Sequence, residues 1–137
     1  LADIESQEFL CEEFIRTKVD MLEEKINKLF KNVKFKMFNT LINGGIEETC
    51  QTLINGVPYS DANNAAKINA GLEIINVISK HYQRSFPVFI DNRESVTKII
   101  PTDCQIANLI VSEKDKTLRI VHAVANLFVV SRRFKNI

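Results

Sequence analysis

The sequence predicts an α/β domain with a mostly parallel sheet, a small β-hairpin and a protruding N-terminal helix. Three observations lead to this prediction. A heptad pattern runs through residues 1–31, alternating residues with turn signals follow at 34–57, and two short runs, 88–90 and 106–111, are apolar on both faces. Strands that are apolar on both faces are typical of parallel sheets covered by helices.

The N-terminal helix is predicted from a seam of aliphatic residues spaced 4, 3, 4, 3 and 4 apart. The seam consists of Ile15, Val19, Leu22, Ile26, Leu29 and Val33. This spacing is that of positions a and d in a heptad, and residues 1–31 lack Pro and Gly. Two interpretations remain open: the end of a coiled coil, or an amphipathic helix packed on its own domain.

A small antiparallel unit is predicted next. Lys34–Asn39 and Glu48–Ile54 alternate polar and apolar residues as half-buried strands do, and Asn43-Gly44-Gly45 is turn chemistry. Asn55-Gly56 fits a type I′ turn between Ile54 and Val57. We expect a hairpin with a further short strand before Pro58.

From residue 60 the pattern becomes helical. Ser60 or Asp61 is positioned to cap a helix that continues to about His81. We then expect strands at 88–91, 105–111 and 117–121, with a short helix or loop at 93–100. No element is predicted for residues 122–137, so the expected organisation is a coiled-coil helix (1–31), one lobe (32–121) and a C-terminal tail (122–137).

Composition limits the possible settings of the protein. The chain has 137 residues, 45% of them hydrophobic, and a net charge of +1, which gives no global signal for nucleic acid or membrane. Its three cysteines form no CxxC pair, which argues against a zinc site or a disulfide framework and predicts a reducing, cytoplasmic setting. No 18-residue apolar run or signal peptide is present, so no membrane partner is expected. The first residue is Leu rather than Met, which leads us to expect a fragment of a longer protein.

The chemistry suggested by the sequence is that of nucleotides. Asp91 ends a buried apolar run, where a carboxylate can hold Mg²⁺, and Asn92 or Glu94 can orient an attacking water. Ser60 stands at an expected helix start, where free amides favour a phosphate. No GxxxxGK[ST] loop occurs, however, which excludes a complete P-loop ATPase within these residues.

Three segments carry a family resemblance: Tyr59–Ala65, Lys67–Leu72 and Val88–Ser95. Together with the preceding heptads and hairpin, they resemble the C-terminal lobe of an SMC-like coiled-coil ATPase of the break-repair and recombination type, in its bacterial or phage-like branch. In that family an N-terminal lobe carries the phosphate loop, and a long coiled coil joins it to a C-terminal lobe with the signature motif and the Walker B strand. The resemblance therefore implies the C-terminal half of an ABC-type head.

The resemblance also implies roles for individual residues around the nucleotide. Ser60 matches the signature serine that touches the γ-phosphate of ATP held by an opposing head. Asp61, Ala62, Asn63 and Asn64 stand where the family usually has Gly-Gly-Glu.

Four further residues correspond to the catalytic end of the family's motifs. Asp91 matches the Walker B aspartate and would be the Mg²⁺ ligand. Asn92 stands where a catalytic glutamate is common, which makes Glu94 a candidate replacement, and Glu113 occupies the position of the switch histidine. These departures bear on the strength of catalysis more than on the fold.

The implied function is ATP binding and hydrolysis in DNA repair, recombination or maintenance. ATP and Mg²⁺ are the implied cofactors, and the lobe would be inactive without the N-terminal Walker A lobe of the same polypeptide. A homodimer of heads and DNA are the further implied partners. The alternative is a non-catalytic module for coiled-coil dimerisation and protein interaction.

Overall fold

The structure is mixed α/β, as expected. A computed structural model describes residues 2–42, 45–113, 117–123 and 127–132. The chain divides into two compact units, Leu1–Ala62 and Asn63–Ile137. This division groups the hairpin with the N-terminal helix, whereas the sequence analysis had placed the hairpin in one lobe with the residues that follow it.

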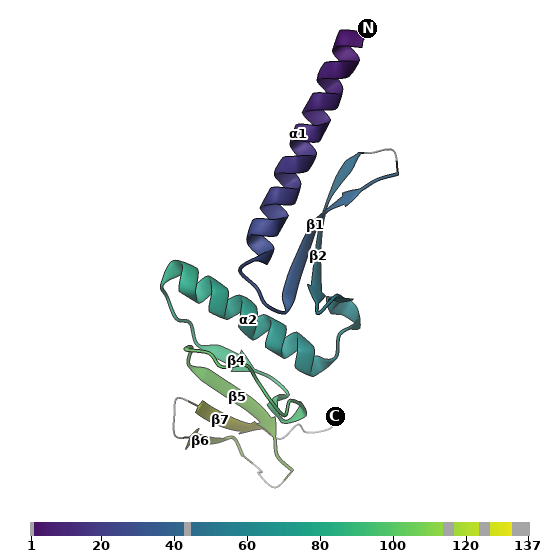
Figure 1. Cartoon of the computed structure of the whole chain (residues 1–137). Helices are drawn as coiled ribbons and strands as arrows, with labels where there is room; N and C mark the ends of the chain where they lie inside the picture. Colours follow the sequence, from purple (N-terminus) through teal and green to yellow (C-terminus); the bar gives the residue numbers. More distant parts are fainter. Residues whose placement is uncertain (1, 43–44, 114–116, 124–126, 133–137) are drawn as a thin grey trace. The chain divides into compact units, whose positions relative to one another are not determined.

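The first unit contains a long helix and a small antiparallel sheet (Figure 1). Helix α1 (Ala2–Asn27) contacts strand β1 (Val33–Thr40). Strand β2 (Ile46–Ile54) pairs with β1 and with the short β3 (Val57–Pro58), so that the order is β1-β2-β3.

The turn between β2 and β3 has the predicted geometry. Asn55 and Gly56 have φ values of 51° and 84°, and Ile54 pairs with Val57 across the turn. Two successive residues with positive φ define a type I′ turn, which matches the right-handed twist of the strands. The Asn-Gly pair is therefore explained by backbone conformation.

Helix α1 ends earlier than the heptad pattern predicts. It stops at Asn27, so the last two positions of the seam, Leu29 and Val33, lie outside it. The Asn27 side-chain amide donates to the Phe35 carbonyl (2.9 Å) and accepts from the Phe35 N–H (2.7 Å), while Lys34 Nζ donates to the Asn27 carbonyl (2.8 Å). The Lys34 bond satisfies a carbonyl at the helix end, and the two bonds of the Asn27 side chain tie that end to the backbone of β1, where Val33 is fully buried.

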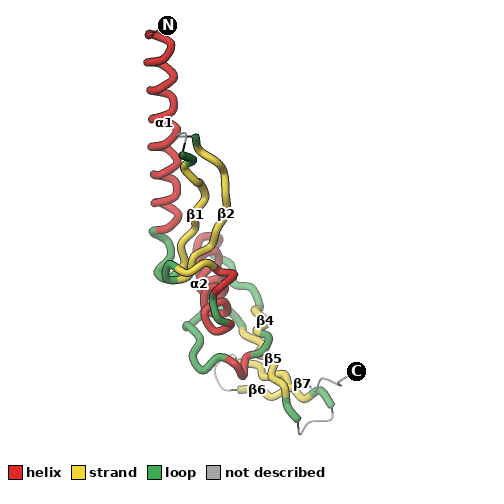
Figure 2. Tube along the Cα trace, turned by 90° about the vertical axis from the view of Figure 1, so that its right-hand side faces the viewer, coloured by secondary structure: helices red, strands yellow, loops and turns green. Residues whose placement is uncertain are grey.

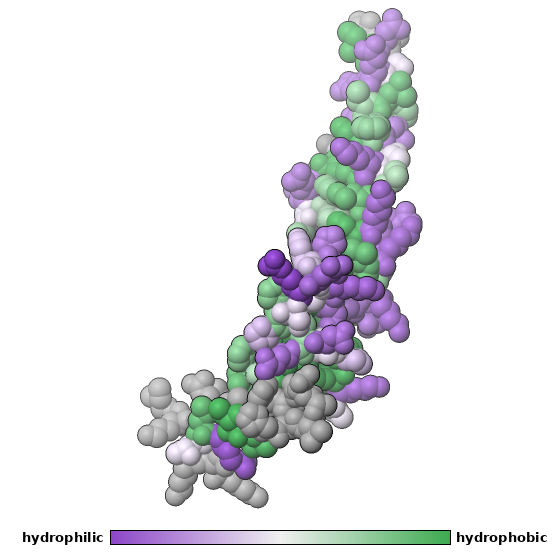
Figure 3. All heavy atoms as spheres, turned by 90° about the vertical axis from the view of Figure 1, so that its left-hand side faces the viewer, coloured by the Kyte–Doolittle hydropathy of each residue, from purple (hydrophilic) through white to green (hydrophobic). Residues whose placement is uncertain are grey.

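Much of the apolar surface of α1 remains exposed within this unit. Apolar and charged side chains are interspersed along it in Figure 3. The exposed large apolar residues of the helix are Ile4, Phe9, Leu10, Phe14, Ile15, Met21 and Leu22. The seam residues Val19 and Ile26 are half-buried. Pairing of α1 with a second helix stays a prediction.

The second unit contains helix α2 and a four-stranded sheet (Figure 2). Helix α2 (Asn64–Tyr82) is followed by β4 (Val88–Ile90), β5 (Ile106–Val111), β6 (Arg119–Ala123) and β7 (Leu127–Arg132). The strand order is β4-β5-β7-β6; β4, β5 and β7 are parallel and β6 is antiparallel to β7.

Strand β7 is the element that the sequence analysis missed. It lies between β5 and β6, so residues 127–132 belong to the sheet and are not a separate tail. Its pairing with β5 joins residues about twenty positions apart. The apolar run Leu127–Val130 is the same kind of signal as the runs at 88–90 and 106–111, so this strand could have been predicted from the sequence.

The core of the second unit forms where α2 covers β4 and β5. Leu72 of α2 packs with Val88, Ile90, Cys104 and Ile106. The side chains at alternate positions of each parallel strand reach the same face, which is why Val88 and Ile90 are buried together while Phe89 between them is 69% exposed. This packing fixes the carboxyl end of β4 relative to α2.

Candidate functional site

Helix α2 begins at a different residue from the one predicted. Its N-cap is Asn63, whose side-chain Oδ1 accepts a hydrogen bond from the Ala66 N–H at 2.8 Å. Ser60 and Asp61 lie before it in a three-residue 3₁₀ turn, η1 (Tyr59–Asp61), and Ala62 is extended. The expectation that Ser60 starts the helix is therefore wrong, because the chain straightens at Ala62 before α2 begins.

This correction separates two groups of predicted site residues. Asn63 and Asn64 stand at the free amides of α2 in the second unit, whereas Ser60 and Asp61 belong to the first unit. The Ser60 hydroxyl donates to the Asp61 carboxylate at 3.0 Å. Their predicted role in binding ATP stays a prediction.

Asp91 lies where the sequence places it, directly after β4. The strand is buried at Val88 and Ile90, and Asp91 is exposed at its carboxyl end. Its Oδ1 accepts a hydrogen bond from the Asn92 N–H at 2.9 Å. Ligands of open α/β sheets bind at this edge of parallel strands.

Asn92 has a clear conformational role. Its backbone is left-handed, with φ 52° and ψ 39°, a region that Asn tolerates better than most residues. Its carbonyl accepts from the Ser95 N–H (3.0 Å) and from the Ser95 hydroxyl (2.7 Å). The Arg93 guanidinium donates to the carbonyl of Val96, whose buried side chain anchors the end of the loop.

The start of α2 is bonded to this loop. Asn64 Nδ2 donates to Ser95 Oγ at 2.6 Å, and the same hydroxyl donates to the Asn92 carbonyl. Asn64 and Asn92, 28 positions apart in the sequence, thus both form hydrogen bonds with the Ser95 hydroxyl, in the loop that follows Asp91.

The two remaining candidates are exposed carboxylates. Glu94 lies in the 3₁₀ turn η2 (Arg93–Ser95), and Glu113 follows β5. Because Ile90 pairs with Asn108 in parallel register, Asp91 and Glu113 both follow carboxyl ends of neighbouring strands. Across the described ranges, no three His, Cys, Asp or Glu side chains gather in a group that suits a metal ion, so Mg²⁺ at Asp91 stays a prediction.

Two asparagines of α2 hold the segment that leads from the loop to β5. Asn69 Nδ2 donates to the Lys98 carbonyl (3.1 Å) and Asn69 Oδ1 accepts from the Ile100 N–H (2.8 Å). Asn76 Nδ2 donates to the Pro101 carbonyl at 3.0 Å. The residues 97–103 form no helix or strand, so these amides supply partners that regular structure does not.

A polar residue that the sequence analysis did not single out lies inside the sheet. Asn108 of β5 is 1% exposed and pairs in register with Ile90, one residue before Asp91. Its side-chain oxygen has no hydrogen-bond partner among the described atoms. A buried amide in an otherwise apolar strand is the signal that could have drawn attention to it.

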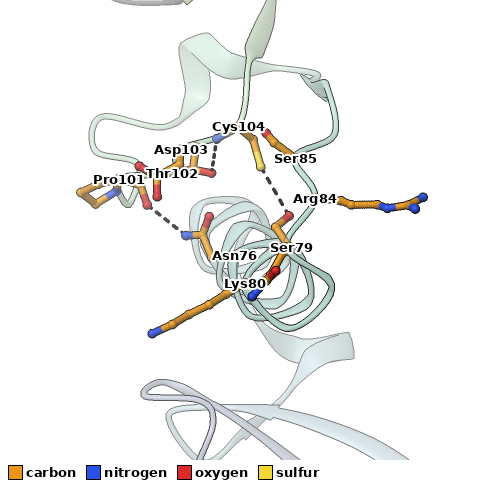
Figure 4. Close-up of a pocket in the computed structure, with 10 residues that line it drawn as sticks. Asn76, Ser79, Lys80, Arg84, Ser85, Pro101, Thr102, Asp103 and Cys104 are labelled. Carbon is orange, nitrogen blue, oxygen red and sulfur yellow. Dashed lines mark hydrogen bonds between the residues drawn. The ribbon is translucent and has the colours of Figure 1, made fainter.

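A cavity of about 660 Å³ opens at the other end of α2, beside the segment that precedes β5 (Figure 4). Its wall combines the last turns of the helix, the residues after it and Pro101–Cys104. The lining residues are Asn76, Ser79, Lys80, Gln83, Arg84, Ser85, Pro101, Thr102, Asp103 and Cys104.

Cys104 is the chemically notable member of this wall. Hydrogen bonding with the Thr102 side chain is the largest cause that lowers the pKa of its thiol to about 7; burial opposes this shift, while Ser85, Ser79 and the Phe86 backbone support it. Thr102 Oγ1 also accepts a hydrogen bond from the Cys104 N–H at 3.2 Å. The Cys104 sulfur lies 3.6 Å from the Ser79 hydroxyl. The sequence analysis did not single out Cys104, because the residues around its thiol come from positions 79, 85 and 102 and form no motif.

Comparisons of the chain with protein-family models, with curated proteins and with solved structures give no match. In the part of the chain that the structure describes, no helix is both long and apolar enough to cross a membrane.

Proposed function

We propose that the chain is the C-terminal lobe of an SMC-like coiled-coil ATPase, which supplies Asp91 to a Mg²⁺–ATP site completed by an N-terminal Walker A lobe. The observation that carries this proposal is the position of Asp91. It directly follows the buried parallel strand β4, and the capped start of α2 is bonded through Ser95 to the loop behind it. A carboxylate at such a strand end is how P-loop hydrolases hold their magnesium.

The open edge of the sheet at β4 supports the proposal that this chain is only part of an ATPase head. Strand β4 has β5 on one side and, among the described strands, no neighbour on the other. Exposed apolar side chains surround this edge: Ile78 and Phe86 are 43% and 51% exposed and line an apolar pocket with Phe89. An open strand edge with exposed apolar groups is an interaction surface, and the N-terminal lobe is the proposed partner.

The residues around Asp91 make slow hydrolysis the expected behaviour of the assembled head. Asn92 has an amide where the family has a catalytic carboxylate, and its left-handed backbone gives it a structural reason to be there. Glu94, in the 3₁₀ turn that follows, and Glu113, after the neighbouring strand β5, are the candidate carboxylates to replace it. ATP and Mg²⁺ are the proposed cofactors, and a cytoplasmic homodimer of heads that acts on DNA is the proposed assembly.

The experiment is reconstitution of ATP turnover. The lobe is produced alone, the polypeptide encoded upstream of it is produced alone, and the two are co-purified. We expect Mg²⁺-dependent ATP hydrolysis only in the co-purified sample. An upstream sequence without a GxxxxGK[ST] motif, or turnover that is the same without this lobe, would refute the proposal.

A second candidate function rests on helix α1. Its exposed apolar residues, among them Phe14, Met21 and Leu22, line a groove with the stems of Lys18 and Lys25. This surface favours a coiled-coil dimerisation and interaction module without catalysis. Sedimentation of the chain tests helix pairing: a Phe14→Glu, Met21→Glu variant that abolishes a dimer supports pairing through α1, and the reconstitution above decides whether catalysis accompanies it.

A further inference from the structure

We propose that the exposed side of helix α1 is a docking surface for a helix of different sequence, whose carboxylates face Lys18 and Lys25. The surface is a groove of about 400 Å³ along the second half of α1, in which the two lysines alternate with Phe14 and Met21. The inference rests on the pairing of α1 that the second candidate function proposes, and it names the partner. It does not depend on the chemistry at Asp91.

The groove lies on the side of α1 that the hairpin leaves free. Arg16, Val19, Glu23 and Ile26 are half-buried at a spacing of 3, 4 and 3, and Glu23 Oε2 accepts a hydrogen bond from the Met37 N–H of β1 at 3.0 Å. The four groove residues named above are exposed at a spacing of 4, 3 and 4. At about 100° per residue, this second stripe is about 150° round the helix from the first. A partner helix can therefore bind α1 without displacing the hairpin.

The charges in the groove decide which helix fits. Next to α1, Lys28 pairs with Glu24 at 2.7 Å, whereas no carboxylate in the described part of the chain pairs with Lys18 or Lys25. A helix laid in the groove removes water from these two ammonium groups, and burial of an unpaired charge costs free energy. Carboxylates at the facing positions of the partner offset this cost and also fix its register.

A second copy of the chain does not supply these carboxylates. Parallel pairing in register places Lys18 against Lys18 and Lys25 against Lys25. Antiparallel pairing centred next to Met21 places Lys18 against Lys25. Both arrangements bring like charges together, which opposes self-pairing and selects a partner of opposite charge.

The test uses a partner that differs from this chain only in the two charges. The full-length double variant Lys18→Glu, Lys25→Glu keeps the apolar positions, and glutamate has about the same helix propensity as lysine. Analytical ultracentrifugation measures the Kd of each protein alone and of their equimolar mixture. We expect the mixture to associate at least about tenfold more tightly than either protein alone. The advantage should shrink at about 1 M NaCl, where the Debye length is about 3 Å.

Two further variants serve as controls. Lys80→Glu, Lys98→Glu, in the second unit, changes the net charge by the same amount outside the groove, so its mixture with the wild type should associate no more tightly than the wild type alone. Lys18→Leu, Lys25→Leu removes the like charges and should pair with itself more tightly than the wild type does.

Three results would overturn the proposal. Self-association of the wild type as tight as that of the mixture would make a second copy the occupant. Equal association in the charge-reversed and control mixtures would show that the groove lysines do not select the partner. No association of either the mixture or the Lys→Leu variant would show that the groove binds no helix. ATP turnover of the co-purified lobes is measured separately, so either result can fail without the other.

Discussion

The connection between the Asp91 loop and β5 depends on Asn69, and its replacement gives a quantitative test of the fold. Asn69 makes two hydrogen bonds to backbone, one to the Lys98 carbonyl and one from the Ile100 N–H. A net contribution of about 1 kcal/mol for each bond gives about 2 kcal/mol. Alanine has a helix propensity about 0.5 kcal/mol better than asparagine, so Asn69→Ala should lower the free energy of unfolding by about 1.5 kcal/mol.

The matched control is Asn76→Ala, which removes one bond from the same helix, to the Pro101 carbonyl. The same reasoning gives a loss of about 0.5 kcal/mol. Urea unfolding of the full chain, followed by circular dichroism at 222 nm, measures both. With a slope of about 1.5 kcal/mol per molar, the midpoint should fall by about 1 M for Asn69→Ala and by about 0.3 M for Asn76→Ala.

Hydrogen exchange adds a local readout of the same contact. The Ile100 amide should lose its protection in Asn69→Ala and keep it in Asn69→Asp, because a carboxylate still accepts from that N–H. Equal midpoints for Asn69→Ala and Asn76→Ala, or an Ile100 amide that exchanges as in the wild type, would refute the assigned role of Asn69.

Three further predictions follow from single residues. Asn63→Ala should destabilise the protein by about 1 kcal/mol and Asn63→Asp by much less, because aspartate also caps helices. Thermal unfolding measures both variants, and equal losses of stability would contradict the role of Asn63 as the N-cap of α2. Asn92→Gly should preserve stability within about 0.5 kcal/mol while Asn92→Val loses about 1–2 kcal/mol, because valine resists positive φ; urea midpoints in the reverse order would exclude the conformational role. The folded pKa of Cys104 is lowered to about 7, so its stabilising contribution is full above the unfolded pKa of about 8.5 and is lost as pH falls through 7. The stability difference between wild type and Cys104→Ala should therefore grow from pH 7 to 9, and a flat difference would contradict the shift.

Local sequence signals predicted the elements whose conformation is set locally. Asn55-Gly56 specified its turn because few residues adopt positive φ in succession. The apolar run before Asp91 specified a parallel strand, although only Val88 and Ile90 of it are buried and Phe89 is exposed. Both signals depend on the backbone or the burial of the residues themselves.

Features that depend on distant partners were missed or misplaced. The aliphatic seam continued through Leu29 and Val33, yet α1 ends at Asn27 because the Asn27 side chain bonds to the Phe35 backbone. Serine and asparagine are both residue types that cap helices. Asn63 is the cap of α2 because the extended backbone at Ala62 separates Ser60 from the start of the helix.

In the candidate sites, too, the locally determined features could be predicted and those that depend on distant residues could not. The place of Asp91 could be predicted from its own strand. The shared Ser95 hydroxyl that joins Asn64 to the Asp91 loop could not, because it requires knowledge of how α2 packs. The hydroxyls around Cys104 come from residues 79, 85 and 102, a spacing that forms no pattern along the chain.

The central claim is that the carboxylate of residue 91 holds the magnesium of bound ATP in the assembled head. It is tested most directly by ATP turnover of the co-purified lobes at saturating Mg²⁺, with the wild type compared with Asp91→Asn. The substitution preserves size and removes the charge, so we expect turnover to fall by at least about tenfold, with the circular dichroism spectrum unchanged. Equal turnover by the two proteins would contradict the claim.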